Sequence, residues 1–278
     1  MFTIDDRRRV HRFVLKMASA DKRVIAGALV GSLVEGGDRW SDIDLTFGVI
    51  DSEPVANVLT DWTRQLSSQL DAVDLFDARA GDTLYRVFIL PGCLQLDISF
   101  TPASRFGPIG SKYKMMFGKG KAKPAAKPTA ADELFGEAVH HALRARFSIE
   151  RKRYWQAEYW ISALRDAAIS LACRRRGLPA RYGRGFDDLP ADILKRFRAA
   201  LVRTLDREEL LRALSSAIKM LLAEGTEAED LLAKTEAQLR ELGRGPARPR
   251  LRGERITRRF GDGWTMPMRQ ARARLGGP

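Results

Sequence analysis

Two short motifs near the start of the chain hold the side chains best suited to chemistry. A glycine–serine pair, Gly31-Ser32, precedes Ser41 and two aspartates one residue apart, Asp42 and Asp44. On a strand, residues i and i+2 point to the same face, so both carboxylates would project side by side. Carboxylates that close repel each other unless a multivalent cation lies between them. The glycine turn supplies backbone N–H groups and a hydroxyl, which suit a polyphosphate. These residues therefore predict phosphoryl or nucleotidyl transfer.

The spacing of these residues resembles the signature of the polymerase-β-like nucleotidyltransferase superfamily, which is Gly-Ser, a spacer, and Asp-x-Asp on the next strand. It is similar to the spacing in small bacterial members, which include antibiotic nucleotidyltransferases. The signature covers residues 31–45 only, but it is far more specific than a lone glycine-rich loop. The sequence departs from the pattern at Glu35, where many relatives have a basic residue, and Arg39 is the candidate to supply that charge.

A third carboxylate is implied on a later strand, and Asp97 is the candidate. The run Leu94–Phe100 alternates apolar and polar residues, which predicts a strand with Asp97 in the middle of its polar face. By itself an acid in that place is usually a solvent-facing residue, and only the preceding motif favours the functional interpretation. Asp74 and Asp77 remain the competitors for the third position.

The resemblance implies a Mg²⁺-dependent enzyme that moves a nucleoside monophosphate to an acceptor hydroxyl and releases pyrophosphate, with ATP as the expected donor. Asp42 and Asp44 would bridge two ions, and Asp97 would complete the site and act as the general base. The nucleotide would be held by Gly31, Ser32, Arg39 and Ser41. No Gly-x-x-x-x-Gly-Lys-Ser/Thr motif occurs, which excludes a P-loop enzyme.

A second candidate base lies in a later helix that is dense in aromatic residues. Tyr154, Glu158, Ser162 and Arg165 are spaced as one polar stripe of that helix. In antibiotic nucleotidyltransferases the neighbouring helical domain can supply an acid that activates the acceptor hydroxyl, and Glu158 is the candidate here. We expect the stripe to face Asp97 across a cleft. The alternative is a salt bridge from Glu158 to Arg151 or Arg165.

Periodicity predicts an α+β fold, with a small mixed-sheet nucleotidyltransferase domain followed by an all-α helical bundle. Apolar or alternating runs predict strands at 24–30, 43–49, 72–77, 85–90 and 94–100. The expected organisation is a transferase domain at 1–106, a linker or mobile loop at 107–129, a helical domain at 130–243, and a basic, disordered tail at 244–278.

Composition limits the remaining classes. No apolar run of membrane-spanning length and no secretory leader is present, and the two cysteines, Cys93 and Cys173, lie in apolar surroundings. We therefore expect a cytoplasmic protein with buried free thiols and without a disulfide or zinc site.

The formal net charge of +13 is unevenly placed, and it bears on the acceptor. Residues 1–120 are neutral, and about half of the excess lies in residues 241–278. Because this charge is dispersed and no known RNA-binding motif occurs, a small-molecule acceptor is favoured. The alternatives are an RNA- or protein-modifying transferase and a non-catalytic nucleotide-binding module.

Overall fold

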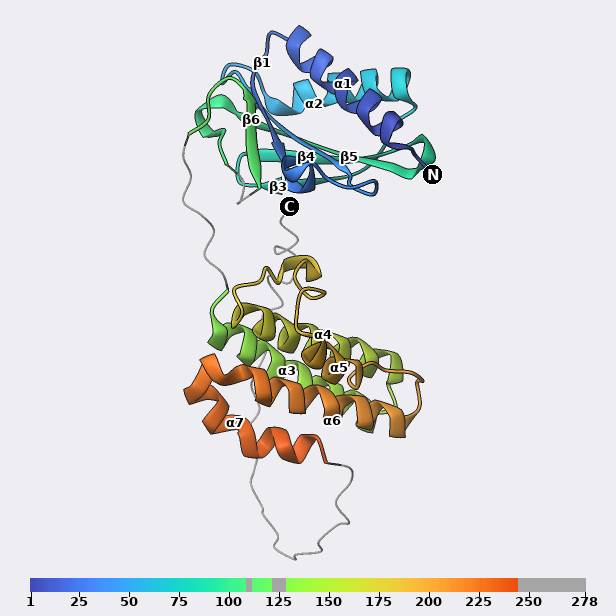
Figure 1. Ribbon diagram of the computed structural model, residues 1–278, viewed down its shortest axis with the longest axis vertical. Helices are drawn as coiled ribbons and strands as arrows, with labels where there is room; N and C mark the ends of the chain where they lie inside the picture. Colours follow the sequence, from blue (N-terminus) through green and yellow to red (C-terminus); the bar gives the residue numbers. More distant parts are fainter. Residues whose placement is uncertain (109–111, 122–128, 245–278) are drawn as a thin grey trace, which may run out of the picture. The chain divides into compact units, whose positions relative to one another are not determined.

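The computed structural model describes residues 1–108, 112–121 and 129–244 of the chain. Its contacts divide the chain into two compact units (Figure 1). One unit holds a six-stranded mixed sheet with helices α1 and α2, and the other holds helices α3 to α7. The predicted α+β class is therefore confirmed. No helix in the described ranges is both long enough and apolar enough to cross a membrane.

The sheet is ordered β3-β4-β5-β2-β1-β6. Its central pair, β2 and β5, is parallel, and the other neighbours are antiparallel. The strands are β1 (Val24–Val30), β2 (Ile43–Val49), β3 (Val73–Ala80), β4 (Thr83–Leu90), β5 (Leu94–Pro102) and β6 (Tyr113–Phe117). The parallel pair brings residues 43–49 beside residues 96–102, far apart in the sequence.

Helices α1 (Ile4–Ala20) and α2 (Val55–Leu70) cover one face of the sheet (Figure 1). Thr3 caps α1, since its hydroxyl accepts from the Asp6 amide while the Asp6 carboxylate accepts from the Thr3 amide. In the core, Trp62 of α2 packs against Phe47 and Phe100, with ring centroids 5.1 and 5.0 Å away. This apolar layer follows from the alternation in β2 and β5, which turns every second side chain toward the helices.

The opposite face of β2 and β5 is polar, yet much of it is buried. Thr46, Ser99 and Thr101 are at most 3% exposed. The Ser99 hydroxyl donates to Thr46 Oγ1 at 2.8 Å, and the Thr101 hydroxyl is 2.9 Å from that of Thr83. Buried hydroxyls are costly unless they are hydrogen-bonded, and these pairs meet that requirement.

The segment expected to be a linker contains a strand. Tyr113–Phe117 forms β6 and pairs with β1 at the sheet edge. Five residues flanked by lysines and glycines give a weak sequence signal, and the pairing depends on β1, more than 80 residues earlier. Residues 109–111 and 122–128 of the expected linker lie outside the described ranges, as does the expected tail apart from Arg244.

The second unit consists of α3 (Ala131–Glu150), α4 (Tyr154–Arg174), α5 (Ala191–Arg198), α6 (Arg207–Glu224) and α7 (Glu229–Leu242). Its core is rich in alanine and leucine, and α4 packs on both α3 and α6. Glu224 is almost fully buried, and it binds the guanidinium groups of Arg175 and Arg176 at 2.9 and 3.0 Å. The helical character of this part agrees with its amphipathic spacing, whereas the domain boundaries remain a prediction.

Candidate functional site

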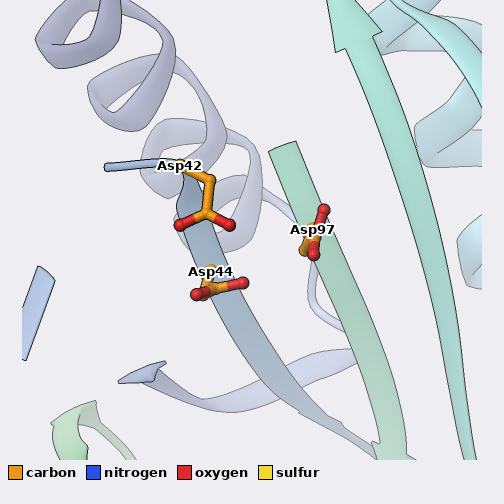
Figure 2. A group of neighbouring side chains, drawn as sticks. All are labelled: Asp42, Asp44 and Asp97. Atoms are coloured by element: carbon orange, nitrogen blue, oxygen red, sulfur yellow. The ribbon is translucent and has the colours of Figure 1, made fainter. Parts of the chain in front are cut away.

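The structure brings Asp42, Asp44 and Asp97 together at one end of β2 and β5 (Figure 2). In the parallel register Asp44 lies opposite Asp97, and Asp42 immediately precedes β2 on the same face as Asp44. One carboxylate oxygen from each residue lies within 4.8 Å of the other two. All three side chains are partly exposed, so a solute can reach them. Among the described residues, this is the group of acids close enough to share an ion.

The environment of Asp97 disfavours its negative charge. Burial, together with a smaller contribution from the charge of Asp42, raises the pKa of this carboxyl to about 6, although a hydrogen bond from Gln95 opposes the shift. The Gln95 amide nitrogen lies 2.9 and 3.1 Å from the two Asp97 oxygens and donates to the carboxylate. Neither Asp42 nor Asp97 forms an ion pair with a lysine or arginine in the part of the chain that the structure describes.

Gly31 allows the backbone after β1 to approach Asp44 closely. Its φ of +72° lies in the left-handed region, and a Cβ at this position would be 2.2 Å from Asp44 Oδ2. The next residues form a short 3₁₀ helix, Gly31–Glu35. Its N-cap is Val30, so Ser32 lies within the turn and does not cap it. The Gly31 amide is used in the fold, because it donates to the Lys112 carbonyl at 3.2 Å.

The loop before Asp42 is held by its own hydrogen bonds. The Ser41 hydroxyl accepts from the Asp38 amide at 2.9 Å and donates to Asp38 Oδ1 at 3.2 Å, and the Trp40 amide donates to the same Asp38 oxygen at 2.8 Å. Ser41 is buried. The structure thus shows a loop-forming contact for Ser41, and its role in nucleotide binding remains a prediction.

Arg7 of α1 also fixes this loop, and sequence reasoning missed it. Its side chain is only 8% exposed, and its guanidinium donates to the carbonyls of Asp38 and Ser41, the latter at 3.2 Å. A sequence signal was present, since Arg7 lies on the same stripe of α1 as the buried Val10, Val14 and Met17. An arginine on an apolar stripe usually has a specific buried partner.

A cavity of about 510 Å³ lies beside the acids. Asp38 and Asp42 contribute to its walls, and no lysine or arginine of the described part of the chain does. It is lined by Met1, Phe2, Ser32, Asp38, Trp40, Ser41, Asp42, Cys93 and Gln95. Cys93 is exposed, so the expectation that both thiols are buried is wrong for this residue, which lies in the turn before β5.

Arg39 and Glu35 are the other two charged residues that the sequence analysis considered in the signature. Arg39 is exposed, stacks over Trp40 at 4.6 Å from the ring centroid, and donates to the Phe2 carbonyl at 3.4 Å. Glu35, the departure from the family pattern, forms an ion pair with Lys112 at 2.6 Å. Nucleotide binding by Arg39 stays a prediction.

The competitors of Asp97 lie elsewhere on the sheet. Asp74 and Asp77 are on the edge strand β3, which β4 and β5 separate from β2, and Asp77 binds Arg86 at 2.6 Å. Glu158 lies on α4 in the helical unit, where it accepts a hydrogen bond from Ser162 at 2.7 Å. Among the described residues, Glu158 forms a salt bridge with neither Arg151 nor Arg165, and Arg165 pairs with Asp166 at 3.1 Å instead. Its catalytic role remains a prediction.

Of the comparisons with known proteins, the one with solved structures found a match. No known family model matches the sequence, and no curated protein matches it. Among solved structures, an aminoglycoside 6-adenyltransferase from Bacillus subtilis is similar over 82% of this chain and 95% of that chain, with 12% identity and a TM-score of 0.38. A likeness at this level says nothing about activity, so the interpretation of the site rests on its own geometry.

Proposed function

We propose that this chain is a Mg²⁺-dependent nucleotidyltransferase that transfers AMP from ATP to a hydroxyl group of a small molecule. The observation that supports it most is the placement of Asp42, Asp44 and Asp97. One oxygen from each of the three carboxylates lies within 4.8 Å of the other two. Neither Asp42 nor Asp97 has a basic partner among the described residues. Such a cluster contributes little to folding and suits a hard divalent cation.

The donor set fits magnesium, which prefers carboxylate oxygens and keeps several positions for water and phosphate. Asp42 and Asp44 would hold two ions, and Asp97 would complete the coordination of one of them. When bound, the ions would lower the pKa of the acceptor hydroxyl and offset the charge of the triphosphate.

The chain's own residues would bind the nucleotide and move a proton. Ser32 lines the cavity beside Asp42, where its hydroxyl can donate to a phosphate oxygen, and the missing side chain of Gly31 leaves room beside Asp44. The acceptor oxygen would attack the α-phosphorus in line, forming a new P–O bond while the bond to pyrophosphate breaks. The acceptor proton would pass to Asp97, which lies opposite Asp44 in the parallel register.

The cavity favours a small acceptor. Its volume of about 510 Å³ falls within the range typical of small-molecule sites.

Glu158 is a second candidate for the base, and two variants separate the candidates. If Asp97 is the base, Asp97→Asn removes the pH dependence on the acid side, whereas Glu158→Gln leaves it in place. If Glu158 is the base, Glu158→Gln removes this pH dependence and Asp97→Asn leaves it in place. Glu137→Gln is a control, since Glu137 is an exposed glutamate of the same helical unit.

The direct test uses the purified full chain, Mg²⁺, nucleoside triphosphates labelled at the α-phosphate, and a panel of hydroxyl-bearing acceptors. Pyrophosphate release together with label on one acceptor supports the proposal. Absence of transfer with every acceptor, while labelled ATP still binds in a Mg²⁺-dependent way, would identify a nucleotide-binding module instead.

A further inference from the structure

Helices α3 and α4 present large aromatic side chains to solvent. On α4, Trp155 is 78% exposed and Tyr159, one turn later, is 62% exposed. On α3, Phe147 is 45% exposed. Single exposed apolar residues are common on proteins, but three large rings on two neighbouring helices form a patch that water solvates poorly.

The contacts between the helices place the segment of α3 around Arg144 beside the aromatic side chains of α4. Only three residues connect α3 to α4, so the two helices pack against each other as an antiparallel pair (Figure 1). Trp160 of α4 lies 5.3 Å from the ring of His141, and Arg144 stacks over it at 5.7 Å. Tyr159 packs edge-on against Trp160 at 4.9 Å. The exposed stripe of α3 therefore adjoins the aromatic side of α4.

Basic side chains without acidic partners lie on α3 and in the three-residue connection to α4. Arg144, Arg151, Lys152 and Arg153 form no salt bridge within the described part of the chain. Many other arginines of this unit are paired with carboxylates, namely Arg146, Arg165, Arg174, Arg175, Arg176, Arg196, Arg203, Arg207, Arg212 and Arg240. The charge of these four side chains is therefore available to an external anion, although Lys195, Arg198 and Lys219 of this unit also form no salt bridge within the described ranges.

We propose that this aromatic–basic face binds single-stranded nucleic acid. The face consists of Phe147, Trp155 and Tyr159 with Arg144, Arg151, Lys152 and Arg153. Exposed rings stack on unpaired bases, and guanidinium and ammonium groups bind the phosphates between them. A duplex hides its bases, so it can use the cations but not the rings.

The extent of the face favours a strand over one nucleotide. From Arg144 to Arg151 the α3 stripe runs for about 10 Å along the helix axis, and the α4 rings lie beside it. Three rings and four cations exceed what one base and its phosphates can contact. The inference concerns the helical unit alone and does not rest on the transferase activity proposed above.

Binding of a labelled single strand of about 20 nucleotides to the full chain tests the proposal, because this length exceeds the usual site size. Fluorescence anisotropy is measured with the wild type and with Trp155→Ala/Tyr159→Ala. The matched control is Tyr182→Ala, which removes a ring that is also 66% exposed and lies under Arg181, at 4.9 Å, but has no exposed aromatic neighbour. Competitors are a duplex of the same sequence and ATP.

The expected result is that the double variant weakens binding about tenfold or more while the Tyr182 control binds as the wild type does. If all four cations contact phosphates, affinity falls about 50-fold between roughly 50 and 200 mM salt. Asp42→Asn binds the strand normally, which separates this inference from the proposed function.

Three results would overturn the proposal. They are no binding at low salt, equal losses in the double variant and the Tyr182 control, or competition by duplex or ATP as strong as by the single strand. If instead the chain self-associates and the double variant abolishes that association without any strand binding, the face is a protein interface and the inference is wrong.

Discussion

Two groups of carboxylates in the sheet-containing unit are held in opposite ways. Asp21, at the end of α1, accepts from the Arg23 side chain at 2.9 Å and from Trp62 Nε1 at 2.9 Å, and Arg23 also binds Asp61 at 2.8 Å. The hydrogen bond from Arg23, followed by that from Trp62, lowers the pKa of Asp21 to about 2. Asp97, in contrast, has a pKa raised to about 6 by burial and by Asp42.

The difference separates a structural acid from the candidate functional group. The Asp21 group carries its own cation and satisfies the indole of the buried Trp62, so it stabilises the fold. The Asp42–Asp44–Asp97 group gathers negative charge where Asp42 and Asp97 have no basic partner among the described residues. We propose that this group binds a divalent cation from solution.

The largest expected effect is on turnover. Asp42→Asn or Asp44→Asn should lower the transfer rate by roughly a thousandfold or more, since each removes a metal ligand. Folding should be retained, as measured by circular dichroism and thermal unfolding, because both residues lie on the polar face of the sheet. The control Asp74→Asn removes a carboxylate from edge strand β3 and should leave the rate unchanged. Comparable turnover in either site variant contradicts the assignment.

Gly31→Ala tests the close approach to Asp44. The new Cβ would be 2.2 Å from Asp44 Oδ2 and would displace that carboxylate, so we expect a loss of activity of about a hundredfold. Gly81→Ala is the control, since Gly81 has a φ of +58° and nothing within 4 Å of an added Cβ. Both changes strain the backbone by about 1 kcal/mol, which unfolding measures, but only the first should affect transfer. Equal activities would show that Gly31 serves the turn alone.

Asp97→Asn should stabilise the metal-free protein above pH 6. The folded-state pKa of about 6 exceeds the ordinary aspartate pKa of 3.8, so the folded state binds more protons between these values and loses stability as pH rises through them. At pH 8 the variant should be more stable by up to about 3 kcal/mol, and at pH 4 the difference should be small. Denaturant unfolding at both pH values measures it. A variant that is less stable at pH 8 contradicts this account of Asp97.

The effect at Asp21 should be smaller and of opposite sign. Its folded-state pKa of about 2 lies below 3.8, so its contribution is present above pH 4 and is lost as pH falls toward 2. Asp21→Asn should cost about 2 kcal/mol at pH 7 because Arg23 loses one charged partner and keeps Asp61. The folded variant should keep normal transfer activity. A large loss of turnover without loss of stability would place Asp21 in the functional site.

The sequence predicted much of the site because its signals are local. Alternation placed Asp42, Asp44 and Asp97 on polar strand faces, and the glycine–serine turn marked the end of β1. The choice of Asp97 over Asp74 depended on sheet order, since β5 pairs with β2 although β3 and β4 lie between them in the sequence. Periodicity does not encode which strands become neighbours.

What sequence reasoning missed depends on contacts between distant segments. Arg7 reaches carbonyls more than 30 residues away, and β6 forms only because β1 offers an edge. Cys93 was expected to be buried from its apolar neighbours, but it lies in a turn with a φ of +63°, which turns it away from the strand pattern.

Metal binding tests the central claim most directly. Mn²⁺ replaces Mg²⁺ at oxygen sites, and its free ion is measured by electron paramagnetic resonance during titration of the full chain. The account predicts saturable binding to the wild type and to Asp74→Asn, and strongly weakened binding to Asp44→Asn and Asp97→Asn. Absence of saturable binding, or equal binding by Asp44→Asn and the wild type, would contradict it.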